Sequence, residues 1–153
     1  MSENQGVGES GSGLVDVTEG EFAGWQVWQS DAFEQRAGPF YEKREADGTM
    51  RTAFRAEPRH MNGAGFMHGG CLMTFADSAI FTIARDAMEG SHGVTLTLTG
   101  DFLDPVRVGQ LVEATGEVVR AGGKTIFVAG LVRAEGAPVL RFDGIIRKVR
   151  GGR

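Results

Sequence analysis

One segment, residues 71–89, constrains the fold of this 153-residue chain more than any other. It is rich in good helix formers, it ends at Gly90, and it carries apolar side chains on almost every helical face. A helix with this pattern is stable where other elements cover it on all sides. Asp77 interrupts the apolar stretch and Arg85 closes it, so the segment is too short and too charged to span a bilayer. We therefore expect a buried central helix with the rest of the domain wrapped around it.

Strand-like runs fill most of the chain on either side of this helix. Residues 94–99 alternate between apolar and polar with period two, which is typical of a half-buried strand. Short connections that contain glycine separate the later runs, and turns this short imply antiparallel neighbours. The expected strands cover residues 40–45, 49–57, 94–103, 111–119, 125–133 and 139–149. The fold class is therefore α+β, with about six strands in one antiparallel sheet.

The N-terminal part of the chain is expected to contribute less to the sheet. Residues 1–13 hold four glycines and three serines, and their few apolar groups cannot offset the entropy of ordering them. We expect a disordered head there, followed by a single domain over residues 14–150. The apolar residues of segment 19–38 recur at spacings of three and four, which predicts a short N-terminal helix. They are Phe22, Trp25, Trp28 and the pair Ala32/Phe33.

Charge and cysteine content exclude several kinds of protein. Sixteen basic residues against twenty acidic ones give a formal net charge of −4, and no block of basic residues offers a surface for nucleic acid. One cysteine, Cys71, cannot form an internal disulfide, and the three histidines lack the spacing of metal ligands, so we expect no metal. The N-terminus has neither a basic start nor an apolar run, so we expect no signal peptide and a cytoplasmic location.

Asp77 is the one charge inside the apolar stretch of the central helix. A carboxylate is costly to bury there unless it is used in chemistry or paired, for example with a nearby arginine. His68, Gly69 and Gly70 begin the helix, where free backbone N–H groups and the positive end of the helix dipole can stabilise an oxyanion. A carboxylate and an oxyanion site together suit hydrolysis of an activated acyl group, with the carboxylate as general base or nucleophile.

The spacing of these groups has a consequence for assembly. Gly69 and Asp77 are eight residues apart, which is roughly 12 Å along a helix. Both groups must lie within about 3 Å of the reacting centre, so they cannot act on one carbonyl from the same chain. If they cooperate, one of them belongs to a second subunit related by a two-fold axis. A functional Asp77 therefore predicts a homo-oligomer, a dimer at least.

Several of these residues form a pattern with further positions. The pattern is Asn62-x5-His68-Gly69-Gly70-x6-Asp77, followed by the strand that starts at Val94 and by Pro105-x3-Gly109. Over about residues 38–149 the chain resembles the hotdog-fold acyl-CoA thioesterases of the phenylacetate-pathway (PaaI-like) type. The resemblance implies a long helix wrapped by an antiparallel sheet, subunits that pair their sheets edge to edge, and in many members a tetramer of two dimers.

The resemblance also implies roles for individual residues. Asp77 would be the base or nucleophile, and the Gly69 amide would polarise the thioester carbonyl. Asn62 would bind that carbonyl or the water, His68 would shape the oxyanion loop, and Thr95 would help to place the water. The implied substrate is an acyl- or aryl-CoA thioester, in which CoA is part of the substrate and no separate cofactor is needed.

Coenzyme A carries phosphates, which call for cations at the rim of the site. By resemblance, its contacts would come from Arg107 and from the connection between two late strands. That connection contributes Arg120, Gly122, Gly123, Lys124 and Thr125. The sequence departs from its relatives by an extra residue at Gly122-Gly123 and by Ile146, where some relatives place a polar contact.

Two other functions stay open on this evidence. A hotdog hydratase or dehydratase would need a catalytic histidine paired with its carboxylate, whereas His68 lies in the glycine turn. A non-catalytic acyl-CoA binding module would gain nothing from the carboxylate of Asp77. Hydrolysis of an acyl-CoA thioester is therefore the function we expect, and the sequence does not identify the acyl group.

Overall fold

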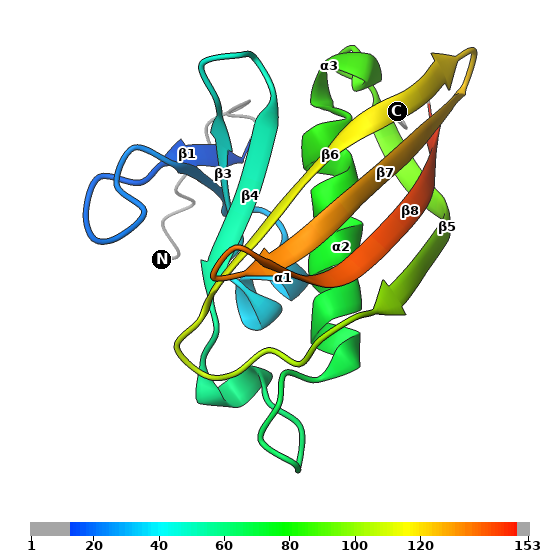
Figure 1. The fold of residues 1–153 in the computed structure, drawn as a ribbon. Helices are drawn as coiled ribbons and strands as arrows, with labels where there is room; N and C mark the ends of the chain where they lie inside the picture. The colour runs from blue at the N-terminus through cyan, green and yellow to red at the C-terminus, as the bar shows by residue number, and fades with distance from the viewer. Residues whose placement is uncertain (1–12, 150–153) are drawn as a thin grey trace, which may run out of the picture.

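The computed structural model describes residues 13–149, in which a curved antiparallel sheet wraps around one long helix (Figure 1). Within these residues eight strands follow one another in the order β1-β2-β3-β4-β6-β7-β8-β5. The strands are β1 (Leu14–Asp16), β2 (Gln26–Trp28), β3 (Tyr41–Arg44), β4 (Met50–Arg55), β5 (His92–Phe102), β6 (Leu111–Gly122), β7 (Thr125–Ala134) and β8 (Ala137–Val149). The helices are α1 (Ala32–Ala37), the 3-10 turn η1 (Pro58–His60), α2 (Gly69–Ile83) and α3 (Arg85–Met88). None of them is long and apolar enough to cross a membrane.

The predicted α+β fold class is confirmed, and all six expected strands are present. The sheet is larger than expected because two further strands, β1 and β2, extend it beyond β3. Each has three residues, which is too short for a period-two pattern to be recognised. The predicted disordered head lies outside the described residues except for Gly13, and so does residue 150.

The helix predicted within residues 19–38 is wrong over most of its length. Gln26–Trp28 form strand β2, and only the six residues of α1 are helical. Gly24 has a φ of +89°, in the left-handed region, so a right-handed helix cannot continue through it. Asp31 caps α1 by accepting hydrogen bonds from two backbone N–H groups of the first turn. The aromatic spacing therefore follows a turn and a strand rather than one helical face.

The central helix differs from its expected range of 71–89. α2 ends at Ile83, and α3 follows as a separate single turn. The sheet covers one face of α2, whose buried residues are Leu72, Phe75, Ala76, Ala79, Ile80 and Thr82. The opposite face, which includes Met73, Asp77 and Phe81, is only half-buried. A helix covered on all sides is therefore not what one chain forms by itself.

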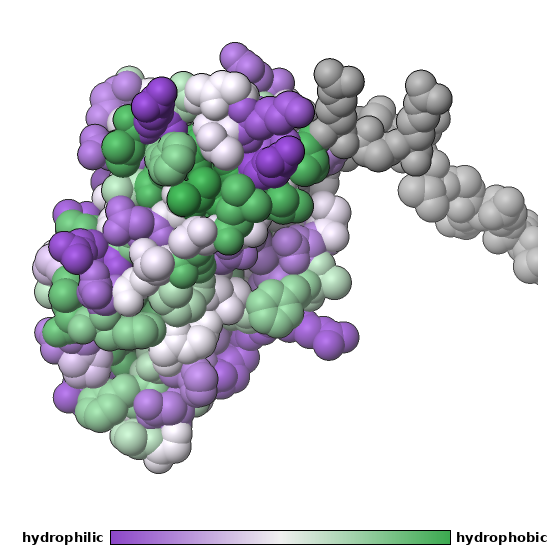
Figure 2. All heavy atoms as spheres, turned by 90° about the vertical axis from the view of Figure 1, so that its right-hand side faces the viewer, coloured by the Kyte–Doolittle hydropathy of each residue, from purple (hydrophilic) through white to green (hydrophobic). Residues whose placement is uncertain are grey.

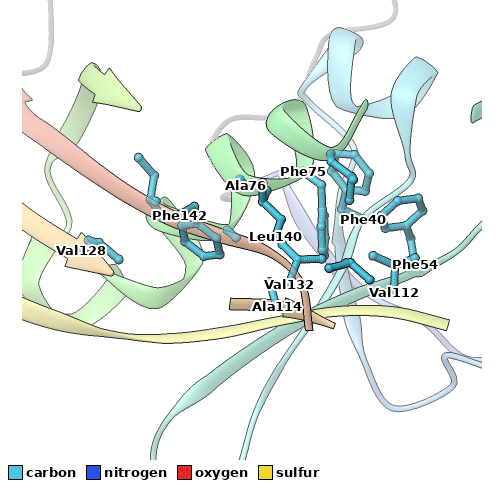
Figure 3. Close-up of a cluster of buried hydrophobic side chains, with 14 of the residues drawn as sticks. Phe40, Phe54, Phe75, Ala76, Val112, Ala114, Val128, Val132, Leu140 and Phe142 are labelled. Atoms are coloured by element: carbon cyan, nitrogen blue, oxygen red, sulfur yellow. The ribbon is translucent and has the colours of Figure 1, made fainter. Parts of the chain in front are cut away.

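Aromatic rings pack between α2 and the sheet (Figure 3), and close contacts at glycines also join the two. The rings of Phe40, Phe54 and Phe75 pack with centroids 4.8, 5.0 and 5.1 Å apart. Burial of such a side chain contributes about 1.5–3 kcal/mol. Gly144 of β8 lies so close to α2 that a Cβ there would be 2.8 Å from Ile80. Glycine at this strand position lets the sheet approach the helix, and this fixes which residues of the two elements face each other.

Candidate active site

Asn62 organises the short loop that precedes α2. Met61 and Met67 form an isolated antiparallel bridge that closes this loop. The side-chain oxygen of Asn62 accepts hydrogen bonds from the N–H groups of Ala64 and Phe66, at 2.9 and 3.1 Å. Its side-chain NH2 group makes no hydrogen bond within residues 13–149 and is able to donate to a ligand.

His68 is the N-cap residue of α2. Its Nδ1 accepts a hydrogen bond from the N–H of Gly70 at 2.9 Å, which satisfies one of the free amides of the first turn. Its own backbone N–H donates to the carbonyl of His60. The N–H of Gly69 has no acceptor in the described part of the chain, and it lies at the positive end of the helix dipole. The start of α2 therefore offers one amide to a carbonyl oxygen or an oxyanion.

Asp77 lies in the middle of α2 and is bonded to a side chain of β5. The hydroxyl of Thr95 donates to Oδ1 of Asp77 at 2.6 Å, and both residues are half-buried. Hydrogen bonds to a carboxylate are short and strong. The two residues are 18 positions apart in the sequence, so the packing of β5 against α2 brings them together.

A β-bulge in β5 decides which of its side chains face α2. The pairing with β8 shifts directly after Thr95, with Leu96 as the extra residue. Before the bulge, Thr95 is turned toward Asp77. After it, the even-numbered positions are turned inward, and a Cβ at Gly100 would lie 2.8 Å from Met73 of α2. β5 therefore runs beside α2 in the opposite direction, so the end of the strand meets the start of the helix.

Phe102, the last residue of β5, lies over Gly69. A Cβ at Gly69 would be 3.3 and 3.4 Å from two carbons of the Phe102 ring. The residue is nevertheless 57% exposed. Phe102 was not expected at the site, because the alternating pattern of the strand gives no sign of the bulge that turns this ring toward α2.

The predicted catalytic residues fall into two groups along α2. Asn62, His68 and Gly69 lie at its N-terminal end, whereas Asp77 and Thr95 lie at its middle. Gly69 and Asp77 belong to the same helix and are roughly 12 Å apart along it. One chain assembles each group but does not bring the two groups together.

The residues predicted to contact coenzyme A are also divided. One set lies together at the β6–β7 connection (Figure 1) and comprises Arg120, Gly122, Gly123, Lys124 and Thr125. Arg107 precedes the other end of β6, where its guanidinium carbon is 4.8 Å from the ring centroid of Phe66. β6 has 12 residues, so roughly 35 Å of strand separates the two places. The cations of one chain therefore do not converge on one point.

Burial changes the pKa of two further groups near α2 that the sequence did not indicate. Burial raises the pKa of Glu34 on α1, and the neighbouring side chain of Ser78 partly opposes this rise. Burial lowers the pKa of His60, whose Nδ1 accepts from the N–H of Glu57 and whose Nε2 is 2.7 Å from the carbonyl of Ala37. Residues 13–149 contain no group of three or more His, Cys, Asp or Glu side chains that could hold a metal ion.

A model of one protein family matches the part of the chain that holds most of these residues. The family is described as the thioesterase superfamily, and the match covers residues 64–140. Among curated proteins, acyl-coenzyme A thioesterase 13 of Homo sapiens is 28% identical over 98 residues, which are 63% of this chain and 69% of that protein. The matched residues of the family model include α2 and β5, and therefore Gly69, Asp77 and Thr95.

Solved structures share the fold. The PaaI protein from the phenylacetic acid degradation operon of E. coli superposes with a TM-score of 0.72 at 23% identity, over 81% of this chain and 88% of that one. A mutant form of the phenylacetic acid degradation protein PaaI from Thermus thermophilus gives a TM-score of 0.68 at 28% identity, over 78% of this chain and 100% of that one. The hotdog fold expected from the sequence is therefore confirmed.

Proposed function

Because this chain belongs to the thioesterase superfamily, we propose that it hydrolyses acyl- or aryl-coenzyme A thioesters to the free acid and coenzyme A. The similarity to human acyl-coenzyme A thioesterase 13 supports coenzyme A esters as the substrate class. The observation that carries the proposal is the half-buried carboxylate of Asp77, which the hydroxyl of Thr95 holds in the middle of α2. Coenzyme A enters as part of the substrate, so the reaction needs no separate cofactor.

Asp77 is suited to activate water or to attack the thioester. The hydroxyl of Thr95 donates to Oδ1, which fixes the carboxylate and leaves Oδ2 to react. As a base, Asp77 takes a proton from water while the water oxygen bonds to the carbonyl carbon, and the C–S bond then breaks to release the thiolate of coenzyme A. As a nucleophile, Asp77 displaces the thiolate to form an anhydride, which water then hydrolyses.

The N–H of Gly69 is suited to stabilise the charge that develops on the thioester oxygen. It has no acceptor within residues 13–149 and begins a helix of 15 residues. Removal of one such donor typically lowers the rate by about 10²- to 10³-fold. Because Gly69 and Asp77 of one chain are roughly 12 Å apart, we propose that the amide at each Asp77 comes from the partner's Gly69.

β5 is the element through which two copies can meet. It is the last strand of the sheet, and its outer edge has no partner in the part of the chain that the structure describes. Figure 2 looks onto this side and shows hydrophobic residues exposed among polar ones. In β5 itself, Val94 is 47% and Leu96 is 53% exposed. An exposed apolar edge strand of this kind favours pairing with another chain.

The contacts between β5 and α2 support one position for the proposed two-fold axis. Thr95 contacts Asp77, and Phe102 contacts Gly69. Antiparallel pairing of two β5 strands about the midpoint of Thr95 and Phe102, next to Leu98, brings the partner's Gly69 toward Asp77. The site is then completed twice in each dimer.

The same two-fold symmetry brings together the residues predicted to contact coenzyme A, which lie at two separate places within one chain. The β6–β7 connection lies at the end of the sheet where β5 begins, since Thr125 and Val94 both pair with Arg147 of β8. In the dimer this end lies next to the end of the partner's β5, from which the partner's Arg107 follows. We propose that Arg120 and Lys124 of one subunit and the partner's Arg107 contact the phosphates of one coenzyme A.

Release of free thiol from a panel of acyl- and aryl-CoA esters tests the proposed function. We expect turnover by the wild type and a loss of about 10²- to 10⁴-fold in Asp77→Asn, the range that a positioned general base contributes. Asp143→Asn is the matched control, because it removes the same charge from an exposed position of β8. Equal turnover in Asp77→Asn and the control would contradict the role of Asp77, and binding without turnover on any ester would favour an acyl-CoA binding module.

Sedimentation tests the assembly. We expect a dimer or a tetramer made of two dimers, and an active monomer would contradict the two-fold argument. The hydratase alternative is not supported, since the Nδ1 of His68 is used to cap α2 and this residue begins the helix rather than pairing with Asp77.

A further inference from the structure

Phe102 is an exposed aromatic residue that lies beside the start of α2. Its ring lies on the Cβ side of Gly69, with the closest carbon 3.3 Å from the position of a Cβ there. The residue is 57% exposed, so it gains little from burial. Leu96 of the same strand and the following residue Leu103 are also exposed, at 53% and 54%, and a patch of exposed apolar residues marks a site for a ligand or a partner.

The bulge in β5 determines that the ring of Phe102 points toward α2. With Leu96 as the extra residue, the side chains that face α2 change from odd to even positions along the strand. Without the extra residue, Phe102 would turn to the outer face of the sheet, because one residue of slip reverses every side chain. One irregularity thus places both Thr95 against Asp77 and Phe102 against Gly69. Bulges that re-aim side chains in this way are common next to active sites.

This apolar ring lies beside the residue whose N–H has no acceptor within residues 13–149. Water beside the N–H competes with a substrate oxygen for the hydrogen bond, and it raises the local dielectric constant. An apolar cover removes that competitor and strengthens the remaining interaction. The cover does this without supplying any polar group of its own.

We propose that Phe102 is a positioning residue of the thioester site, which keeps the Gly69 amide dry and acts in trans. In the dimer, the partner's Phe102 arrives with the partner's Gly69 beside Asp77 and Thr95. This inference rests on the proposed thioesterase function and extends it, because it assigns the partner an apolar wall as well as an amide. The cover acts on the oxygen as charge develops, so its loss lowers kcat more than it raises KM.

The first experiment measures kcat and KM on an ester that the wild type hydrolyses. We expect Phe102→Ala to lower kcat by about tenfold with a smaller change in KM, and Phe102→Leu to restore most of it, because leucine keeps an apolar cover. Leu103→Ala is the control, since this neighbouring residue is equally exposed at 54%. Sedimentation of each variant shows whether the dimer is intact.

The second experiment decides between action in cis and in trans. Asp77→Asn and Phe102→Ala chains are co-expressed with different tags, and the mixed dimer is purified by both tags. In trans, one of its two sites has an intact Asp77 together with an intact Phe102 and Gly69 from the other chain. We then expect about half of the wild-type kcat per dimer. In cis, each site carries one substitution, and the mixed dimer stays at or below the level of Phe102→Ala.

The outcomes separate this inference from the function on which it rests. No hydrolysis of any ester by the wild type contradicts the proposed function. Wild-type hydrolysis with an unchanged kcat in Phe102→Ala contradicts the inference alone. A lower kcat that Phe102→Leu does not restore contradicts the role of Phe102 as an apolar cover that excludes water. A mixed dimer that does not recover activity contradicts the action in trans.

Discussion

The two ends of the candidate site are built in different ways. The start of α2, called the local end below, is held by hydrogen bonds between residues close in sequence. Asn62 accepts from loop amides two and four positions ahead, and His68 accepts from the amide of Gly70. The middle of α2, called the long-range end below, is held by a hydrogen bond between Asp77 and Thr95, which are 18 positions apart. The local end depends on a loop and a helix cap. The long-range end depends on how the edge strand β5, with its bulge, packs against α2.

This difference indicates how each end can fail. A local loop keeps its shape when distant packing changes, but it presents only backbone amides, which ordinary substitutions do not remove. A long-range pair presents side chains that are easily changed, but it is lost when the strand shifts by one residue. The dimer proposed here joins the local end of one chain to the long-range end of the other.

After Asp77→Asn, the largest effect is expected from removal of the Gly69 amide at the start of α2. Gly69→Pro deletes the N–H at the first helical position, where proline is tolerated, and the extended backbone of His68 (φ −60°, ψ 132°) suits a following proline. We expect kcat to fall by about 10²- to 10³-fold with the helix content unchanged by circular dichroism. Gly69→Ala keeps the N–H and should lose far less activity. Equal kcat values for the two variants would show that the amide is not the donor.

A smaller effect is expected from Thr95, the partner of Asp77 at the middle of α2. Thr95→Val removes a hydrogen bond to a carboxylate, which is worth about 1.5–3 kcal/mol, so we expect kcat/KM to fall by about 10- to 100-fold. Thr95→Ser keeps the hydroxyl and should recover most of the activity. Thr97→Val, on the exposed stretch just beyond the bulge, serves as the control. If Thr95→Val behaves like Thr97→Val, the bond to Asp77 has no role in the reaction.

What the sequence could predict follows the same division. The glycines before the helix and the alternation of residues 94–99 are local patterns, so the start of α2 and six of the strands were predictable. The bulge at Leu96 depends on the pairing of β5 with β8, which no local pattern carries, so Phe102 was missed. Glu34 was missed for a related reason, since the burial of its carboxyl depends on how α1 packs beside Ser78 of α2, which no local pattern carries.

The catalytic assignment itself came from a resemblance, and residue patterns alone supported only part of it. A threonine on the polar face of a strand is ordinary, and nothing local distinguishes Thr95 from Thr97. The fold distinguishes them, because only Thr95 is bonded to Asp77. In the same way, the half-exposed face of α2 could not be read from its sequence, which is apolar on nearly every side.

Asn62 tests whether the loop is only a scaffold. Asn62→Ala loses two hydrogen bonds to loop amides, and we expect the Tm to fall by about 3–6 °C. Asn62→Asp keeps both acceptor contacts and should restore the Tm, but it lacks the NH2 group that could bind substrate. We expect its kcat/KM to stay about fivefold lower than that of the wild type. Full recovery of activity in Asn62→Asp would limit Asn62 to shaping the loop.

The smallest effect is expected at His60, which contacts the residue that caps α2. It appears in stability rather than in activity. His60 is buried, its carbonyl accepts the N–H of His68, and burial lowers the pKa of its ring. The unfolded chain therefore binds a proton at His60 before the folded protein does, so stability is full above about pH 6.5 and falls as the pH drops toward the lowered folded value. We expect the free energy of unfolding, measured by urea denaturation at several pH values, to fall by at most about 1.4 kcal/mol per pH unit, the limit for one proton.

His60→Gln should remove this dependence, because glutamine does not titrate, whereas substitution of the exposed His92 should leave it in place. A pH dependence that survives His60→Gln would assign it to another group and leave the loop supported independently of the charge of His60.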